Sequence, residues 1–211
     1  MSDERGTPSK DYKAETIQAY EKYAEHFDRK FALHFEKWVK PYAQAFLALL
    51  PGTRVLDLGC GPGCHAQYFQ KHGLDVLCCD LSPAMVEYCR RKGLNASVMD
   101  MEDLGFPPCS FDGIWAYASL LHLPKAKIPG VIARLRSMLR QRGVIAVSFK
   151  QGRTEGFEGH EDLPGTQRWF SRVTAEELIA WFDVGFELLC SASTTVSAKS
   201  TFIHAVFRCT I

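Results

Sequence analysis

A chain of 211 residues, of which 46% are hydrophobic and 23% are charged, is long enough for one globular domain with a sizeable core. The formal net charge of +1 provides no overall attraction to nucleic acid or to an anionic membrane. The opening residues, MSDERGTPSKDYK, contain no apolar segment of the kind that signals secretion, and no apolar run is long enough to span a bilayer. We therefore expect a cytoplasmic protein without a membrane partner, in which the eight cysteines are reduced thiols.

The first fifty residues are expected to be helical. Residues 1–10 are polar, whereas the apolar positions after Lys13 recur at helical spacing. Pro41 can begin a further helix, which Pro51–Gly52 ends. Aromatic residues at such spacing most often pack against a core. The aromatic stripe consists of Tyr12, Tyr20, Tyr23, Phe27, Phe31 and Trp38.

Strands and helices alternate after residue 53. This order predicts an α/β fold, with a doubly wound, mostly parallel sheet and an antiparallel C-terminal strand pair, in a single domain over residues 1–211. A polar, glycine-rich connector, Gln151–Gly165, precedes the last helix. The expected strands are residues 54–59, 74–81, 96–101, 111–119 and 143–150, with 186–194 and 201–209 as the closing pair. The expected helices are residues 64–73, 82–93, 128–139 and 174–185.

The loop after the first strand, in the stretch RVLDLGCGPGCHAQYF, allows three interpretations. Cys60, Cys64 and His65 suggest a metal, but no second Cys/His pair has the spacing of a zinc site, so we predict no metal. A nicotinamide dinucleotide loop requires a third glycine where Cys64 stands, and no Lys–Ser/Thr pair completes a P-loop. The remaining pattern is D-x-G-x-G-x-G, formed by Asp57, Gly59, Gly61 and Gly63.

This third pattern favours a cofactor that carries a ribose. Glycine lets the main chain approach a ligand closely. Asp80 ends the second strand, where its carboxylate can accept two hydrogen bonds from a ribose diol, and Asp57 places negative charge near a ligand ammonium or sulfonium. Both acids also have a structural interpretation, since Asp80 can cap the helix that begins at Ser82 and Asp57 can orient the loop amides.

The chain resembles the Rossmann-like (class I) S-adenosylmethionine-dependent methyltransferases from roughly Ala43 to Lys150. VLDLGCGPG resembles the first motif of that family and CCDLSPAMVEYCR its ribose-binding segment. MDMEDLGFPPCSFDGIWAYASLLHL resembles the adenine-binding and following segments, and LRSMLRQRGVIAVSF resembles the last motif. The resemblance implies S-adenosyl-L-methionine as the cofactor. By position, it implies cofactor contacts from Asp57, Gly59, Gly61, Gly63, Asp80, Leu81, Asp100, Met101, Glu102 and Tyr117.

The resemblance also implies that residues 1–40 form a helical lid over a Rossmann-like core, residues 41–211. Tyr20 would then face the sulfonium or the acceptor, where aromatic rings favour a cation. His122 stands where related enzymes often carry a histidine pair, but Leu121 replaces the first member, so His122 is either a base or a packed imidazole. Arg168 can clamp an acceptor carboxylate or form an exposed salt bridge. We therefore predict Tyr20, His122 and Arg168 as the catalytic residues.

The leading hypothesis is methyl transfer to an O, N or S nucleophile of a small molecule. In-line transfer depends mainly on alignment, and a base is needed only where the acceptor must lose a proton. The alternatives are a tRNA-modifying methyltransferase, which the near-neutral charge disfavours, and a non-catalytic protein that binds S-adenosylmethionine. A nicotinamide dehydrogenase is disfavoured by Cys64. The sequence leaves the acceptor and the oligomeric state open.

Overall fold

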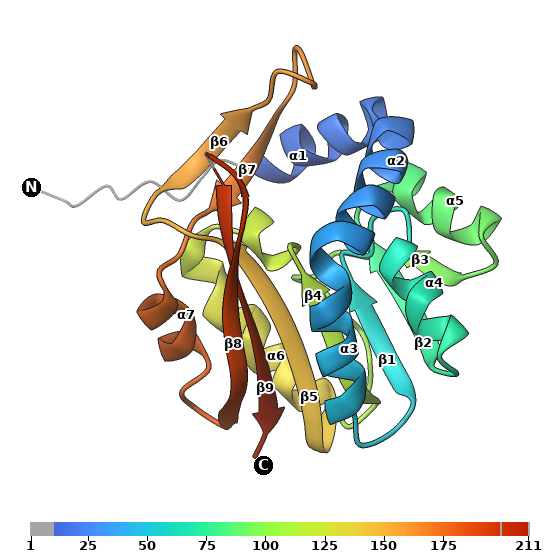
Figure 1. Cartoon of the computed structure of the whole chain (residues 1–211), viewed down its shortest axis with the longest axis vertical. Coiled ribbons are helices and arrows are strands. Elements are labelled where there is room, and N and C mark those ends of the chain that lie inside the picture. Colours follow the sequence, from blue (N-terminus) through green and yellow to red (C-terminus); the bar gives the residue numbers. More distant parts are fainter. Residues whose placement is uncertain (1–10, 199, 211) are drawn as a thin grey trace, which may run out of the picture.

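A seven-stranded β-sheet forms the centre of the computed structural model, which describes residues 11–198 and 200–210 (Figure 1). The strand order is β3-β2-β1-β4-β5-β9-β8. Neighbours from β3 to β5 are parallel, whereas β9 is antiparallel to both β5 and β8, as the sequence predicts. The strands are β1 (Arg54–Leu58), β2 (Asp75–Asp80), β3 (Asn95–Val98), β4 (Phe111–Tyr117), β5 (Leu139–Lys150), β8 (Phe186–Ser197) and β9 (Ser200–Cys209).

Helices connect the parallel strands and precede the first of them. Ser82 caps α5 through its side chain, which accepts a hydrogen bond from the Met85 amide, and Pro83 is the first helical residue, as predicted. No helix in the described residues is both long and apolar enough to cross a membrane. The helices are α1 (Asp11–Lys22), α2 (Ala24–His34), a π-helical turn (Phe35–Val39), α3 (Lys40–Leu49), α4 (Cys64–Lys71), α5 (Pro83–Arg91), two 3₁₀ turns (Leu120–His122 and Lys125–Lys127), α6 (Ile128–Met138) and α7 (Ala175–Trp181).

Successive side chains along each strand point to opposite faces of the sheet, which divides the core into two layers. Val55 and Trp115 face a layer closed by α3, α4 and α5, whereas Leu56 and Ile114 face a layer closed by α6 and α7. The two layers therefore hold the sheet between helices on both faces, which is the doubly wound α/β architecture expected from the sequence (Figure 1).

A small second sheet lies beside α1, at the edge of the main sheet where the parallel strands end (Figure 1). Its strands are β6 (Glu155–Gly159) and β7 (Gln167–Ser171), which pair antiparallel. The sequence predicted only a polar connector over Gln151–Gly165, and this part of the prediction was incomplete. The segment EGFEG contains two glycines and one apolar residue, so β6 shows little strand pattern of its own and is defined by its pairing with β7.

The strand order reverses between β1 and β4, because β1 leads to β2 on one side whereas β4 pairs with β1 on the other. Ligands of open α/β sheets bind outside the carboxyl ends of the strands at such a switch point. Helices α1 and α2 lie across this edge in Figure 1. The predicted lid, residues 1–40, includes these two helices, while its residues 1–10 lie outside the described part of the chain.

Candidate active site

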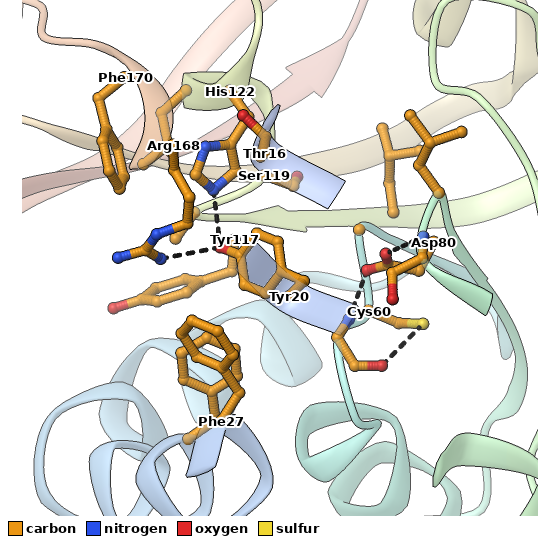
Figure 2. A pocket seen from close by; sticks show the side chains of 18 of the residues that line it. Thr16, Tyr20, Phe27, Cys60, Asp80, Tyr117, Ser119, His122, Arg168 and Phe170 are labelled. Carbon is orange, nitrogen blue, oxygen red and sulfur yellow. Dashed lines mark hydrogen bonds between the residues drawn. The ribbon is translucent and has the colours of Figure 1, made fainter. Parts of the chain in front are cut away.

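A cavity of about 420 Å³ lies at the switch point. Its floor is formed by residues at and after the carboxyl ends of β1, β2, β3 and β4, and its cover comes from α1, α2 and β7. Figure 2 shows aromatic and cationic side chains on one side of this space and Asp80 with the glycine loop on the other. Of the thirteen predicted site residues, ten line the cavity: Tyr20, Gly59, Gly61, Asp80, Leu81, Asp100, Met101, Tyr117, His122 and Arg168.

The glycine loop has a left-handed backbone at all three glycines, with φ of +69° at Gly59, +53° at Gly61 and +85° at Gly63. A Cβ on Gly61 would meet only Phe31 of α2, at 3.4 Å, so the main chain at Gly61 is open on its cavity side. A Cβ on Gly63 would lie 2.8 Å from the sulfur of Cys89. Gly63 therefore serves close packing of the loop against α5 and does not line the cavity.

Asp80 connects β2 to the glycine loop. Its two carboxylate oxygens accept hydrogen bonds from the amides of Gly61 and Ser82, each at 2.9 Å. Burial raises the pKa of Asp80 to about 6, against the opposing effect of these backbone donors. Each oxygen keeps a further lone pair, so the carboxylate can still accept hydrogen bonds from two ligand hydroxyls.

Asp57 lies behind the loop and is absent from the cavity wall. Its carboxyl group is almost completely buried, and one oxygen has no hydrogen-bond partner among the described residues. Burial raises the pKa of Asp57 well above its ordinary value. The structure therefore places Asp57 under the loop, where it can hold loop geometry, rather than beside the other predicted cofactor contacts.

Glu102 also lies outside the cavity wall, because its carboxylate is engaged by other side chains. It forms ion pairs with Lys13 and Lys127, each at 2.7 Å, and accepts a hydrogen bond from Tyr12. Partial burial opposes ionisation, but the hydrogen bonds from these three partners lower the pKa of Glu102 to about 2. Lys13 also pairs with Asp100, so the start of α1 is held to the segment after β3.

Tyr20, His122 and Arg168 meet on the opposite side of the cavity (Figure 2). The Nδ1 atom of His122 lies 2.7 Å from the Trp169 carbonyl, which can only accept, so Nδ1 carries the proton. The Nε2 atom then accepts from the Tyr20 hydroxyl at 2.8 Å, and that hydroxyl accepts from Arg168 at 3.2 Å. Burial, together with the nearby positive charge of Arg168, lowers the pKa of His122 to about 3, while burial raises that of Tyr20. Both groups are neutral at pH 7.

Lys150 brings a second cation next to Arg168, and both lie over the ring of Phe170. The guanidinium of Arg168 stacks on Phe170 at 4.9 Å, and the Lys150 ammonium lies 3.4 Å from the centre of the same ring. Lys150 also pairs with Glu158 at 2.9 Å, and burial lowers the pKa of its ammonium. Arg172 shares the Glu158 carboxylate at 2.7 Å, and Arg168 and Lys150 are the cations that line this side of the cavity.

Helices α1 and α2 and the β6–β7 hairpin form a joined cover. Thr16 accepts a hydrogen bond from the Trp169 amide at 3.0 Å, and Tyr23 donates to the Pro164 carbonyl at 2.8 Å. The Tyr20–Arg168 contact is part of the same seam. The described part of the predicted lid therefore closes against the segment that contains Arg168.

Tyr117 lies flat between two other rings. The centres of Trp115 and His204 are each 5.3 Å from that of Tyr117, with the planes within 9° of parallel. Burial raises the pKa of Tyr117, which keeps the phenol neutral. Small side chains on the intervening strand, including Ser148, leave room for this stack.

Several residues in the cavity wall were not predicted as contacts. His65 had been considered only as a metal ligand, and here its Nδ1 accepts from the Trp115 indole at 3.1 Å while burial lowers its pKa to about 4. Lys30 of α2 and Phe170 of β7 also line the cavity, although neither was named as a contact. The tip of the closing strand pair contributes Val196, Ser197, Ser200 and Phe202, which no sequence motif had marked as contacts.

A doubly wound sheet whose glycine loop and acidic strand end meet in one cavity defines a fold class that binds nucleoside-containing cofactors. The family model for a methyltransferase domain matches residues 55–143. The chain is 31% identical over 156 residues to the ubiquinone biosynthesis O-methyltransferase of Xanthomonas campestris pv. campestris, across 66% of this chain and 64% of that protein. It is 32% identical over 153 residues to the aklanonic acid methyltransferase DauC of Streptomyces sp. strain C5, across 64% of each. The match thus spans just under two thirds of these relatives.

Solved structures share the whole fold. The Burkholderia thailandensis 1,6-didemethyltoxoflavin-N1-methyltransferase, with bound 1,6-didemethyltoxoflavin and S-adenosylhomocysteine, aligns with a TM-score of 0.76 at 20% identity over 100% of this chain and 94% of that one. The DhpI–SAH complex aligns with a TM-score of 0.74 at 20% identity over 95% and 98%. Over its central part this chain is therefore similar to methyltransferases, and it has the fold of the solved methyltransferase structure, which supports the resemblance that its motifs indicated.

Proposed function

We propose that this protein is an S-adenosylmethionine-dependent methyltransferase that acts on an O, N or S nucleophile of a small molecule. The observation that carries the proposal is one cavity with two chemically different ends. One end presents an open glycine backbone and the Asp80 carboxylate, and the other presents Tyr20, His122 and Arg168 (Figure 2).

The glycine-loop end fits the family's cofactor. Gly61 lines the cavity without a side chain of its own, with the Phe31 ring as its nearest side-chain neighbour, and Asp80 is held by two backbone amides and keeps further lone pairs. We assign Asp80 to the ribose, Leu81, Asp100 and Met101 to the adenosine surroundings, and Gly59 and Gly61 to the loop contact. Asp57, Gly63 and Glu102 would support this site from outside the cavity. Bound S-adenosylmethionine would supply an electrophilic methyl group on a sulfonium.

The opposite end is assigned to the acceptor. Arg168 and Lys150 give this wall positive charge, which favours an acceptor that carries an acidic oxygen or a carboxylate. Such an acceptor enters as its anion and needs little help from a base. The Tyr20 hydroxyl, fixed between His122 and Arg168, is placed to orient the acceptor, and the closed cover of α1, α2 and β7 would keep water out.

His122 is then a positioning residue. Its protonated Nδ1 is held by the Trp169 carbonyl, which leaves Nε2 as the acceptor for Tyr20. Because its pKa is lowered to about 3, a neutral His122 is a weak proton acceptor at pH 7. Of the two interpretations of His122, a base or a packed imidazole, this geometry supports the packed imidazole. Its hydrogen bond with Tyr20 orients the Tyr20 hydroxyl.

The remaining parts of the proposal concern partners and location. We propose a small-molecule acceptor rather than a nucleic acid, since the formal net charge of +1 gives no general attraction to phosphates. A cytoplasmic location is consistent with eight cysteines, most of which are buried. Residues 1–40 would act as the lid and residues 41–211 as the core of a single domain.

Calorimetric titration with S-adenosylhomocysteine and with NAD tests the cofactor assignment. We expect binding of the former only, and a preference for NAD would refute the assignment. Methyl transfer from labelled S-adenosylmethionine to pooled acidic metabolites, to neutral metabolites and to bulk tRNA then tests the acceptor class. Label in tRNA alone would favour the RNA-modifying alternative, and cofactor binding with no transfer to any pool would favour the non-catalytic one.

A further inference from the structure

Three thiols from separate segments meet directly behind the glycine loop. They belong to Cys60 of the loop, Cys78 of β2 and Cys89 of α5, and all three are buried. Their sulfur atoms all lie within 4.8 Å of one another, and those of Cys60 and Cys89 are 3.6 Å apart. In the described residues, this is the one group of three or more such side chains close enough to share a metal ion.

The triangle of sulfur atoms has the size of a metal site. An equilateral triangle with sides of 3.6 Å, the Cys60–Cys89 distance, has its centre about 2.1 Å from each corner, and one with sides of 4.8 Å, the upper limit here, about 2.8 Å. A metal–thiolate bond is about 2.3 Å. Structural zinc sites are four-coordinate, whereas this group offers three ligands. Thiolates select soft ions. We propose that Cys60, Cys78 and Cys89 bind one soft metal ion of the Cu(I) class, and that its binding weakens cofactor binding at the glycine loop.

An ion can reach this group from the cavity. Cys60 lines the cavity wall and keeps 4% of its surface exposed, whereas Cys78 and Cys89 lie behind it with none. In Figure 2 the Cys60 sulfur lies next to the glycine loop, on the same side of the cavity as Asp80. Cys60 is therefore the entry ligand, and the two buried sulfurs complete the site.

Metal binding alters the hydrogen bonding of the loop. The Gly61 carbonyl accepts from the thiols of Cys89 and Cys60, at 3.2 and 3.5 Å. On binding, the three S–H protons pass to solvent and three metal–sulfur bonds form, with no change in oxidation state. The Gly61 carbonyl would then face two sulfur atoms that no longer donate. The peptide that joins Gly61 to Pro62 would turn away, which changes the backbone angles of Gly61. The Gly61 amide belongs to the preceding peptide and bonds Asp80 at 2.9 Å, so it would be displaced through the shared Cα atom.

The site can be tested without any assumption about methyl transfer. The reduced, full-length protein is titrated anaerobically with Cu(I) against a chromophoric Cu(I) chelator. We expect one ion per chain, and we expect Cys60→Ser, Cys78→Ser and Cys89→Ser each to weaken binding roughly tenfold or more. Cys109→Ser and Cys190→Ser, which change exposed cysteines, are the matched controls and should bind as the parent does.

Two measurements on the parent chain avoid variants that fail to fold. Bound Cu(I) should protect Cys60, Cys78 and Cys89 from alkylation, as read by mass spectrometry after a denaturing quench. The loaded protein should bind S-adenosylhomocysteine roughly tenfold or more weakly than the metal-free protein. Uptake of Cu(I) that leaves these thiols unprotected, uptake that no cluster variant reduces, or equal S-adenosylhomocysteine affinity with and without the ion would each overturn the proposal.

Discussion

Asp80 offers the sharpest test of the cofactor site. Replacing it with alanine removes the acceptor for two ligand hydroxyls, and leaving these groups unpaired costs roughly 1.5–3 kcal/mol. The dissociation constant of S-adenosylhomocysteine should therefore rise about 10- to 150-fold. The same substitution also removes the acceptor of the Gly61 and Ser82 amides, so part of the loss would come from a loosened loop.

Asp80→Asn separates these two contributions, because its side chain keeps one carbonyl oxygen and nearly the same shape. The contribution of the Asp80 negative charge can then be measured from the pH dependence of cofactor affinity. Burial raises the pKa of Asp80 from 3.8 to about 6, so the ligand-free fold favours the protonated carboxyl and loses this contribution to stability as pH rises through about 6. Ligand hydroxyls favour the carboxylate, so cofactor affinity should fall as pH drops below about 6, by up to about tenfold per unit.

Calorimetry measures the affinity for S-adenosylhomocysteine and its dependence on pH between about pH 5 and pH 8. We expect the parent to weaken on the acid side and Asp80→Asn to show a flat profile at lower affinity. Unchanged affinity in Asp80→Ala, or the same acid-side weakening in Asp80→Asn, would show that Asp80 does not hold the ribose.

Gly61→Val should abolish S-adenosylhomocysteine binding, because a branched side chain is strained at φ of +53° and would press on Phe31. The far-ultraviolet circular dichroism spectrum should stay unchanged, and normal binding would mean that the cofactor lies elsewhere. Tyr20→Phe should lower kcat roughly tenfold or more while cofactor affinity stays within about twofold, and an unchanged kcat would remove Tyr20 from the acceptor site. S-adenosylhomocysteine should protect the bonds of residues 20–31 from limited proteolysis, and identical cleavage with and without it would argue against a lid. A chain lacking residues 1–30 should still melt cooperatively but transfer little methyl; aggregation on truncation would instead mean that this segment belongs to the core.

The fold was predictable because most of its elements carry a local signal. Ser82 followed by Pro83 predicts the start of a helix. The change from apolar residues at helical spacing to a continuous apolar run at Val55 predicts a strand. Strand β6 carries no such signal. Its residues are glycines and glutamates around Phe157, so the strand exists only because β7 lies alongside.

The positions of predicted site residues in the cavity wall could be predicted where the local backbone determines them. Gly61 and Asp80 are set by the loop and the strand end, and the motif locates both. Glu102 could not be placed in this way, because its surroundings depend on Lys13, about ninety residues earlier in the chain. The cluster of three thiols around Cys60 was missed for the same reason. Cys60 is close to Cys64 in the sequence, but in the fold its neighbours are Cys78 and Cys89.

Helix α1 touches both ends of the cavity. Lys13 pairs with Asp100 and Glu102 at the end that we assign to adenosine. Tyr20 bonds His122 at the end that we assign to the acceptor, two helical turns or about 10 Å along the same helix. A ligand that holds α1 against the cavity at one end lowers the entropy cost of ordering this helix. A ligand at the other end then binds an already ordered helix. The two ligands should therefore bind cooperatively, and linkage requires the effect to be reciprocal: whatever factor the acceptor gains from the cofactor, the cofactor gains from the acceptor.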